Sequence, residues 1–399
     1  MLLANKNLDI IIGLPTYNNG KTINYVVRSA YSGLLEFFHN KNIQIVISDM
    51  GSTDKTVEVI FSLIGRMGDK LKLMQYRRNK RIGEAIKDIL VHGVENNAKA
   101  IVILDPGLPN IKPMWMYLLI NKVLSGEYDV IAPYYYKHEY EAMITNFVVY
   151  PIMSAIFGLR IRNPVAMDCS LSTAAARVIL EEEKLWSKYV TGLGIDVLMA
   201  VTAIIKELKI AQASLGKLEY FEDLKLNLAQ SFREKTKFLF ELMYHYMPYW
   251  TKITKIRDPP IIGEIKDVTG IRPQLIDWLL FDAFYKLYKT HESLISEIYN
   301  EKIVKNLHEI HRNKNTKVRI SSDVWTEILR DTIVAYIKKW PEKSDEIVDA
   351  FMGLWALKVL SFTNETKGMS ADEAEKVIIN HAKTFETARI ELLKIIKNV

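Results

Sequence analysis

The sequence predicts an α/β domain built on a mostly parallel sheet, followed by an all-helical domain. In the first half of the chain, short apolar runs alternate with segments whose apolar residues repeat at helical spacing. After about residue 225 the strand signals almost vanish, and long helical periodicities take over. Strands that alternate with helices form right-handed βαβ units and a parallel sheet. We therefore predict two domains, residues 1–224 and 225–399.

Individual elements follow from the same patterns. Apolar runs predict strands at residues 10–14, 44–48, 72–76, 100–104 and 130–136, with a weaker candidate at 210–214. Helical spacing predicts helices at residues 21–39, 54–67, 83–97 and 147–159 in the first domain. In the second domain it predicts helices at residues 226–247, 272–288, 294–306, 322–339, 345–361 and 371–397. Residues 258–270 contain a Pro-Pro pair and glycines, which predict a loop.

Composition excludes several classes of protein. The chain is 49% hydrophobic and 25% charged, which is typical of a globular protein with a substantial core. Its net charge of +6 is spread among interspersed acidic and basic residues, so we expect a solvated surface and no nucleic-acid partner. Cys169 is the single cysteine, which excludes an intrachain disulfide and fits a reducing compartment. We predict a cytoplasmic protein without a signal peptide or a transmembrane segment.

The first candidate site follows the first predicted strand. Pro15 ends this strand, and Thr16, Tyr17 and Asn18 follow it. Ligands of open α/β sheets bind beyond the carboxyl ends of the strands. There Tyr17 offers a stacking face and Asn18 an amide to a nucleotide base. The alternative is an ordinary strand-to-helix loop.

A second candidate ends the next predicted strand. The carboxylate of Asp49 can accept hydrogen bonds from the imide N–H of uracil or from the N1–H and amine of guanine. Ser52, Thr53 and Asp54 then offer N-cap chemistry to the following helix, which is the structural alternative for this segment.

Together these two segments resemble the paired signature of family 2-like GT-A glycosyltransferases. That signature is a Pro-Ala/Thr-Tyr-Asn loop followed by an Asp-Asp-Gly-Ser-Thr-Asp loop, and here Met50 replaces the second Asp of the latter. The resemblance implies a GT-A (Rossmann-like) domain that binds a nucleotide-sugar donor. The residues it assigns to the nucleotide are Pro15, Thr16, Tyr17, Asn18, Asp49, Lys80 and Asp105.

A divalent cation is the cofactor that the resemblance implies. GT-A enzymes carry an Asp-X-Asp motif where this chain has Asp105 followed by Pro106 and Gly107, so the second carboxylate is missing. Mannosylglycerate synthases carry a metal-binding His where this chain has Glu219. Carboxylates are good ligands of Mg²⁺ and Mn²⁺. The expected metal ligands are therefore Asp105 and Glu219.

Further segments are similar to sugar–acid synthases. Residues 141–145 are similar to mannosylglycerate synthases, and residues 144–146, 150–151 and 162–168 resemble glucosylglycerate and glucosyl-3-phosphoglycerate synthases, with Ala166 and Met167 replacing a Gly-Gly pair. The resemblance places Lys137 and Thr145 at the acceptor. Residues 192–196 are similar to a Trp-Gly-Ile-Asp motif whose Asp lies near the reacting sugar, which makes Asp196 the catalytic candidate.

The resemblance implies a retaining hexosyltransferase that uses a UDP- or GDP-sugar and a small hydroxy-acid acceptor, glycerate or 3-phosphoglycerate, to make a compatible solute. One alternative is a catalytically impaired relative that binds a nucleotide or a protein partner. Another is a polyprenyl-phosphate glycosyltransferase, because residues 158–164 resemble a segment of dolichyl-phosphate mannose synthases. Aromatic residues of the helical domain, such as Phe238 and Phe240, indicate either a homo-oligomer interface or a core within the domain.

Overall fold

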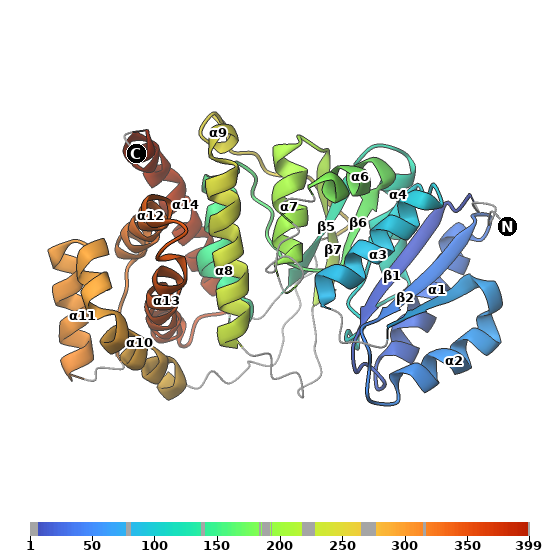
Figure 1. Cartoon of the computed structure of the whole chain (residues 1–399), viewed down its shortest axis with the longest axis horizontal. Helices are drawn as coiled ribbons and strands as arrows, with labels where there is room; N and C mark the ends of the chain where they lie inside the picture. The colour runs from blue at the N-terminus through green and yellow to red at the C-terminus, as the bar shows by residue number, and fades with distance from the viewer. Residues whose placement is uncertain are drawn as a thin grey trace. The chain divides into compact units, whose positions relative to one another are not determined.

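The computed structural model describes residues 7–76, 81–136, 140–182, 185, 192, 194–217, 228–264, 277–313 and 317–397 (Figure 1). The chain divides into two compact units. Unit 1 comprises residues 1–136, 161–226 and 259–268, and unit 2 comprises residues 137–160, 227–258 and 269–399. Each unit is thus made of three segments, which alternate along the chain with the segments of the other unit. The predicted boundary between residues 224 and 225 lies outside the described residues and stays a prediction.

Unit 1 is built on a mixed sheet with the strand order β3-β2-β1-β4-β6-β5-β7-β8. Its strands are β1 (Ile10–Thr16), β2 (Ile43–Asp49), β3 (Leu71–Gln75), β4 (Ala100–Ile103), β5 (Val130–Tyr136), β6 (Cys169–Ser172), β7 (Ile210–Lys217) and β8 (Ile261–Ile262). Neighbouring strands pair in parallel, except that β6 runs antiparallel to both β4 and β5. The predicted α/β fold with a mostly parallel sheet is confirmed. Strands β6 and β8 were not predicted, because neither has a long apolar run.

Helices cover both faces of this sheet (Figure 1). They are α1 (Ile23–Phe38), α2 (Thr56–Met67), α3 (Ile82–Glu95), α4 (Met114–Leu124), α6 (Thr173–Glu181) and α7 (Ile195–Ile205). Strand β1 is buried along its whole length, as expected for a strand covered on both sides. Ile10, Ile12 and Leu14 pack with α1, α2 and α4 in one core cluster. Gly13 faces the other side, where an added Cβ would lie 2.2 Å from the Ile89 side chain, so α3 packs tightly on β1.

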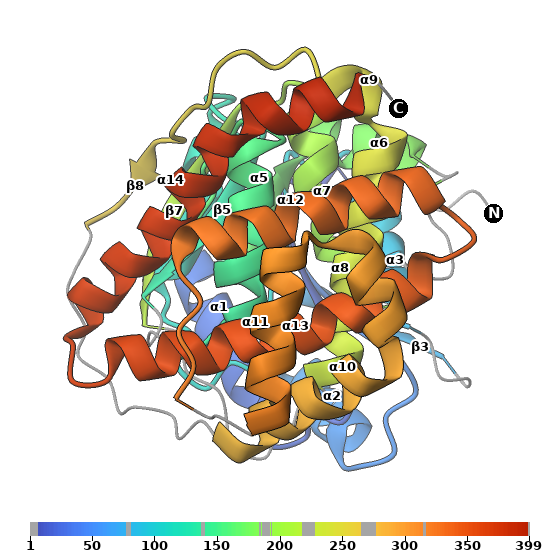
Figure 2. The ribbon, with the colours of Figure 1, turned by 90° about the vertical axis from the view of Figure 1, so that its left-hand side faces the viewer.

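Unit 2 is helical (Figure 2). It contains a π-helical turn (Thr145–Val149) that leads into α5 (Tyr150–Ala155), then α8 (Leu228–His245), α9 (Met247–Trp250), α10 (Asp277–Ile298), α11 (Glu301–Asn313), α12 (Ser322–Lys339), α13 (Ser344–Thr366) and α14 (Ala371–Ile396). Helix α13 packs against α10, while α14 packs against α12 and α5. The predicted break between residues 288 and 294 coincides with a kink, because the backbone of His291 is non-helical, with φ of −113° and ψ of 18°. The second predicted helix, residues 294–306, is itself divided, since α10 ends at Ile298 and α11 begins at Glu301.

The aromatic residues of unit 2 form its own core. Phe238 and Phe240 are each only 1% exposed, and the Phe240 ring lies 5.1 Å from Tyr336 and 6.0 Å from Phe351. The interpretation of these phenylalanines as core within the domain is therefore confirmed, while the homo-oligomer stays a prediction. Among the described residues, no helix has the length and apolarity needed to span a membrane.

Candidate functional site

Two loops that carry the signature segments lie side by side at the carboxyl edge of the sheet. Thr16 pairs with Asp49 in the parallel register of β1 and β2, so the loops after these strands start at the same level. The backbone N–H of Met50 donates to the Thr16 carbonyl over 2.8 Å. The sheet therefore places the loops that follow β1 and β2, which carry the first two candidate segments, next to each other.

Asn18 joins the first loop to the second. Its backbone N–H donates to the Ser52 hydroxyl oxygen at 2.9 Å, and its side-chain Oδ1 accepts the N–H of Thr53 at 2.8 Å. Asp54 returns the contact, because its Oδ2 accepts the Gly20 N–H at 3.1 Å. Asp54 Oδ1 also accepts the N–H of Thr56, the first residue of α2, at 2.9 Å. Of Ser52, Thr53 and Asp54, which were predicted to offer N-cap chemistry, Asp54 makes this contact, while the N-cap residue itself is Lys55.

Asp49 is completely buried and its carboxylate serves its own loop. Oδ2 accepts the backbone N–H of Gly51 and of Ser52, both at 3.2 Å, and Oδ1 accepts the Ser52 hydroxyl at 2.5 Å. A base that bound this carboxylate would have to compete with these donors. The predicted contact between Asp49 and a nucleotide base stays a prediction.

In the first signature segment, Tyr17 and Asn18 are exposed, Tyr17 by 44%, whereas Pro15 and Thr16 are buried. The Thr16 hydroxyl donates to the Leu14 carbonyl at 3.0 Å and so belongs to the strand end. Lys80, the remaining predicted nucleotide residue of this region, lies outside the described residues.

Asp105 forms a carboxylate pair with Asp168, a residue that was quoted in the sequence but not assigned a role. The Asp105 backbone N–H donates to Asp168 Oδ1 at 2.8 Å, and Asp105 Oδ1 accepts the Gly107 N–H at 2.8 Å. The antiparallel pairing of Ile103 with Cys169 explains this neighbourhood, because Asp105 follows β4 and Asp168 precedes β6 at the same edge. Asp168 reaches Asp105 only because β6 runs antiparallel to β4. The sequence pattern did not predict β6, so it could not predict this pair.

The environment of this pair disfavours two negative charges. Asp168 is 2% exposed. Burial and then the Asp105 charge raise the pKa of Asp168 to about 7, against hydrogen bonds from the Asp105 backbone and the Tyr135 side chain that lower it. Burial also raises the pKa of Asp105, which the hydrogen bond from Gly107 opposes. Ionisable groups with perturbed pKa values cluster at functional sites, so this pair marks the edge of the sheet as a candidate site.

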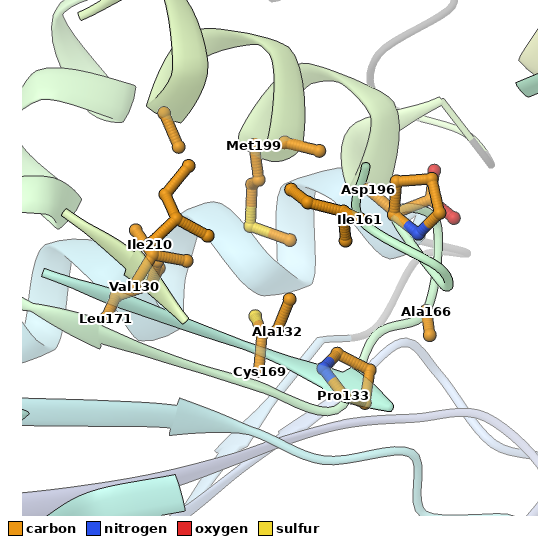
Figure 3. A pocket seen from close by; sticks show the side chains of 13 residues that line it. Val130, Ala132, Pro133, Ile161, Ala166, Cys169, Leu171, Asp196, Met199 and Ile210 are labelled. Carbon is orange, nitrogen blue, oxygen red and sulfur yellow. The ribbon is translucent and has the colours of Figure 1, made fainter. Parts of the chain in front are cut away.

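Asp196 lies in the first turn of α7 beside a small cavity (Figure 3). The cavity, of about 30 Å³, has a mostly apolar lining that includes Ala132, Ala166 and Met199. A space of this size has room for water but not for a sugar ring. Burial, followed by the charges of Asp168 and Asp196, raises the pKa of the Cys169 thiol to about 12. The charges of Asp168 and Asp196 thus both act on the first residue of β6.

The described side chains could ligate a cation only if phosphate oxygens and water supplied most of its ligands. Within the part of the chain that the structure describes, no group of three or more His, Cys, Asp or Glu residues is placed to hold a metal ion. Asp105 is only partly buried, and among the described residues no hydrogen bond to its Oδ2 is found. Mg²⁺ commonly binds one or two carboxylates together with substrate phosphates and waters, so Asp105 suits such a site. Glu219, the other predicted ligand, lies outside the described residues.

The predicted acceptor residues belong to unit 2. Thr145 begins the π-helical turn of that unit and is 6% exposed. Lys137 lies outside the described residues. The acceptor role of both residues stays a prediction.

Comparisons with known proteins give one family match and several similar solved structures. Residues 11–182 match the model of the family "Glycosyl transferase family 2". No curated protein matches the chain. Similar solved structures include glucosyl-3-phosphoglycerate synthase from Mycobacterium tuberculosis in complex with Mn²⁺, UDP-glucose and phosphoglyceric acid, at 20% identity and a TM-score of 0.45 over 59% of this chain and 79% of that chain.

The same enzyme in complex with Mg²⁺ and UDP is 19% identical, with a TM-score of 0.45 over 59% of this chain and 78% of that chain. A structure described as a mycobacterial protein is 20% identical, with a TM-score of 0.43 over 59% and 74% of the two chains. The strand order, the two signature loops and the family match together identify residues 11–182 as a family 2-like glycosyltransferase domain of the GT-A type.

Proposed function

We propose that this protein transfers a hexosyl group, with retention of configuration, from a UDP- or GDP-hexose to a small hydroxy acid such as glycerate or 3-phosphoglycerate. The observation that carries the proposal is the contact between the partly buried Asp105 and the buried Asp168 at the carboxyl edge of the sheet. A like-charge pair costs stability in the folded protein, which is the arrangement expected where charge serves binding or chemistry.

The donor end of the proposed site is built from the β1 and β2 loops and the residues after β4. Tyr17 has the exposed ring on which a base would stack. Asp105, with Glu219 as a second ligand, would hold Mg²⁺ or Mn²⁺. When bound, such a cation neutralises the nucleoside diphosphate leaving group. This chain's own contribution is to fix Asp105 through the hydrogen bonds from its backbone to Asp168 and from Gly107 to its side chain.

The acceptor end rests on resemblance. Lys137 and Thr145 would hold the acid, and Asp196 would lie near the anomeric carbon. A sugar–acid product of this kind is a compatible solute, made in the cytoplasm. The sugar ring would bind outside the water-sized cavity next to Asp196.

A thermal-shift screen of UDP- and GDP-sugars, with Mn²⁺ and with EDTA, tests the donor. We expect one of the two nucleotides to raise the melting temperature in Mn²⁺, because a ligand at 100 times its Kd stabilises the native state by about 2.7 kcal/mol. Incubation with the shifting donor and either glycerate or 3-phosphoglycerate, followed by mass spectrometry, should then reveal a glycosylated acid. If no nucleotide sugar shifts the melting temperature in either condition, the proposal is wrong.

A catalytically impaired relative is the second candidate, and Gly107 in place of the expected carboxylate favours it. This candidate predicts nucleotide binding of equal affinity in Mn²⁺ and EDTA, with no glycosylated product. The screen and the product assay therefore separate the two functions.

A further inference from the structure

We propose that Asn18 and Asp54 are positioning residues that brace the β1 and β2 loops against each other, instead of contacting the nucleotide themselves. This proposal rests on the proposed function, in which these loops bind the donor. Asn18 was predicted to offer its amide to a base. In the structure the amide oxygen is already committed to the neighbouring loop.

The brace is reciprocal. From the first loop, Asn18 Oδ1 accepts the backbone N–H of Thr53 at 2.8 Å and lies 3.4 Å from the N–H of Asp54. From the second loop, Asp54 Oδ2 accepts the backbone N–H of Gly20 at 3.1 Å. Each loop thus supplies one side-chain acceptor for the backbone of the other. Such contacts fix the relative position of both backbones, because a displaced loop would leave donors and acceptors unpaired on both sides.

A third contact ties the brace to the strand end. The Asn18 backbone N–H donates to the Ser52 hydroxyl oxygen, and that hydroxyl donates to Asp49 Oδ1. Asp49 is fully buried and belongs to β2, so the chain of hydrogen bonds ends on a rigid element. The first loop is therefore anchored to the second strand as well as to the second loop.

The residue types suit this task. Asn18 has φ of +54°, a left-handed conformation that asparagine, aspartate and glycine tolerate better than other residues. Burial disfavours the ionised form of Asp54, but hydrogen bonds from Thr56 and Gly20 outweigh it and lower its pKa. The ionised carboxylate can therefore serve Gly20 with one oxygen and Thr56 with the other.

The contacts of Asn18 also determine the position of Tyr17, the residue before it. The backbone N–H of Tyr17 donates to Asn19 Oδ1 at 2.9 Å, and its side chain is 44% exposed. Fixing Asn18 fixes the backbone from which the Tyr17 ring projects. The expected effect of losing the brace is weaker nucleotide binding through a misplaced Tyr17.

Two substitutions separate bracing from direct contact. Asn18→Gly keeps the left-handed backbone and removes the side-chain acceptor, whereas Asn18→Asp keeps both the backbone and an acceptor oxygen but loses the amide N–H groups. We expect Asn18→Gly to weaken UDP or GDP binding at least about 10-fold in calorimetry with Mn²⁺, and Asn18→Asp to stay within about 3-fold of the parent. Asn97→Gly is the matched control, because Asn97 also has φ of +54° and follows α3, before the amino end of β4.

Amide hydrogen exchange of residues 50–56 provides a readout that does not need a ligand. Exchange should accelerate about 10-fold or more in Asn18→Gly and return to the parent rate in Asn18→Asp. Unchanged exchange in Asn18→Gly would overturn the brace. Faster exchange with unchanged nucleotide affinity would overturn its positioning role, and restored exchange with lost affinity in Asn18→Asp would show direct contact. If the parent protein binds neither UDP nor GDP, the proposed function fails and with it the positioning role, while the exchange data still decide whether the brace exists.

Discussion

Asp105→Asn is expected to lower kcat/KM for hexosyl transfer at least about 100-fold and, at the same time, to make unit 1 more stable at pH 8. On the proposed function, the loss of activity follows from losing the charged ligand that Asp105 would provide for a cation at the leaving group. The gain in stability follows from the pair itself. The Asn side chain keeps an acceptor for the Gly107 N–H but removes one of two charges that the folded state disfavours.

The pH dependence of this gain has a definite sign. The folded-state pKa of Asp168, about 7, is raised above the ordinary value of 3.8, and that of Asp105 is raised as well. Such groups contribute stability at low pH that is lost as the pH rises through the folded pKa. The parent should therefore lose stability between about pH 4 and pH 7, and Asp105→Asn should lose less. We expect the variant to exceed the parent in free energy of unfolding by on the order of 1–2 kcal/mol at pH 8, and each kcal/mol should raise the melting temperature by about 2–4 °C.

Thermal unfolding in EDTA at pH 5 and pH 8, combined with steady-state kinetics in Mn²⁺, measures both effects. Asp129→Asn is the control, because Asp129 directly precedes β5 and accepts the Lys209 N–H at 3.0 Å, at the amino end of that strand. It should leave activity unchanged. An Asp105→Asn protein that is less stable than the parent at pH 8, or that transfers sugar at the parent rate, would contradict the prediction.

Periodicity predicted the elements of the sheet that are buried on both sides. The run at residues 130–136 matches β5 at both ends, and the runs at 10–14 and 100–104 lie within one or two residues of β1 and β4. Continuous apolar runs are the signal of such strands. Strand β6 has the sequence Cys-Ser-Leu-Ser and gives no such signal, because its pairing between β4 and β5 is decided by tertiary contacts.

The candidate site was predictable in position but not in its internal contacts. Motifs at strand ends located Asp49 and Asp105 because strand ends meet at one edge of a parallel sheet. The partner of Asp105 could not be found in the same way, since Asp168 reaches this edge only through the antiparallel direction of β6. Nor does a sequence motif reveal that the Asn18 and Asp49 side chains are occupied by their neighbouring loops.

A buried lysine in unit 2 leads to a prediction on stability. Lys358 of α13 is fully buried, with its Nζ 2.8 Å from the Ile320 carbonyl oxygen and 2.8 Å from His381 Nε2. Burial lowers the pKa of Lys358 to about 7, although the charge of Glu365 opposes this. Burial and the Lys358 charge lower the pKa of His381 to about 3. The folded state of unit 2 thus favours the neutral form of both groups.

Stability of unit 2 is therefore expected to rise with pH from about 7 to 9. Between the folded pKa of about 7 and the ordinary value of 10.5, the unfolded chain binds more protons at Lys358 than the folded chain does. Stability increases with pH in that window, by on the order of 2 kcal/mol between pH 7 and pH 9. His381 adds a separate rise between about pH 3 and its ordinary value of 6.5. Urea unfolding followed by tryptophan fluorescence measures this rise, with Trp325 and Trp355 buried in unit 2 and Trp115 buried in unit 1.

Lys358→Met should flatten the rise between pH 7 and pH 9. At pH 9 the variant should also be less stable than the parent by about 1–3 kcal/mol, because the Ile320 carbonyl and His381 each lose a buried partner. At pH 7 the difference should shrink, since the variant no longer carries an amine whose protonation opposes folding. Lys286→Met is the matched control, because its side chain is 73% exposed in α10 and pairs with Asp282 at the surface, so the variant should keep the parent's slope. Equal pH slopes for the parent and Lys358→Met would show that Lys358 stays protonated inside the helical unit and that its contacts stabilise the ammonium form.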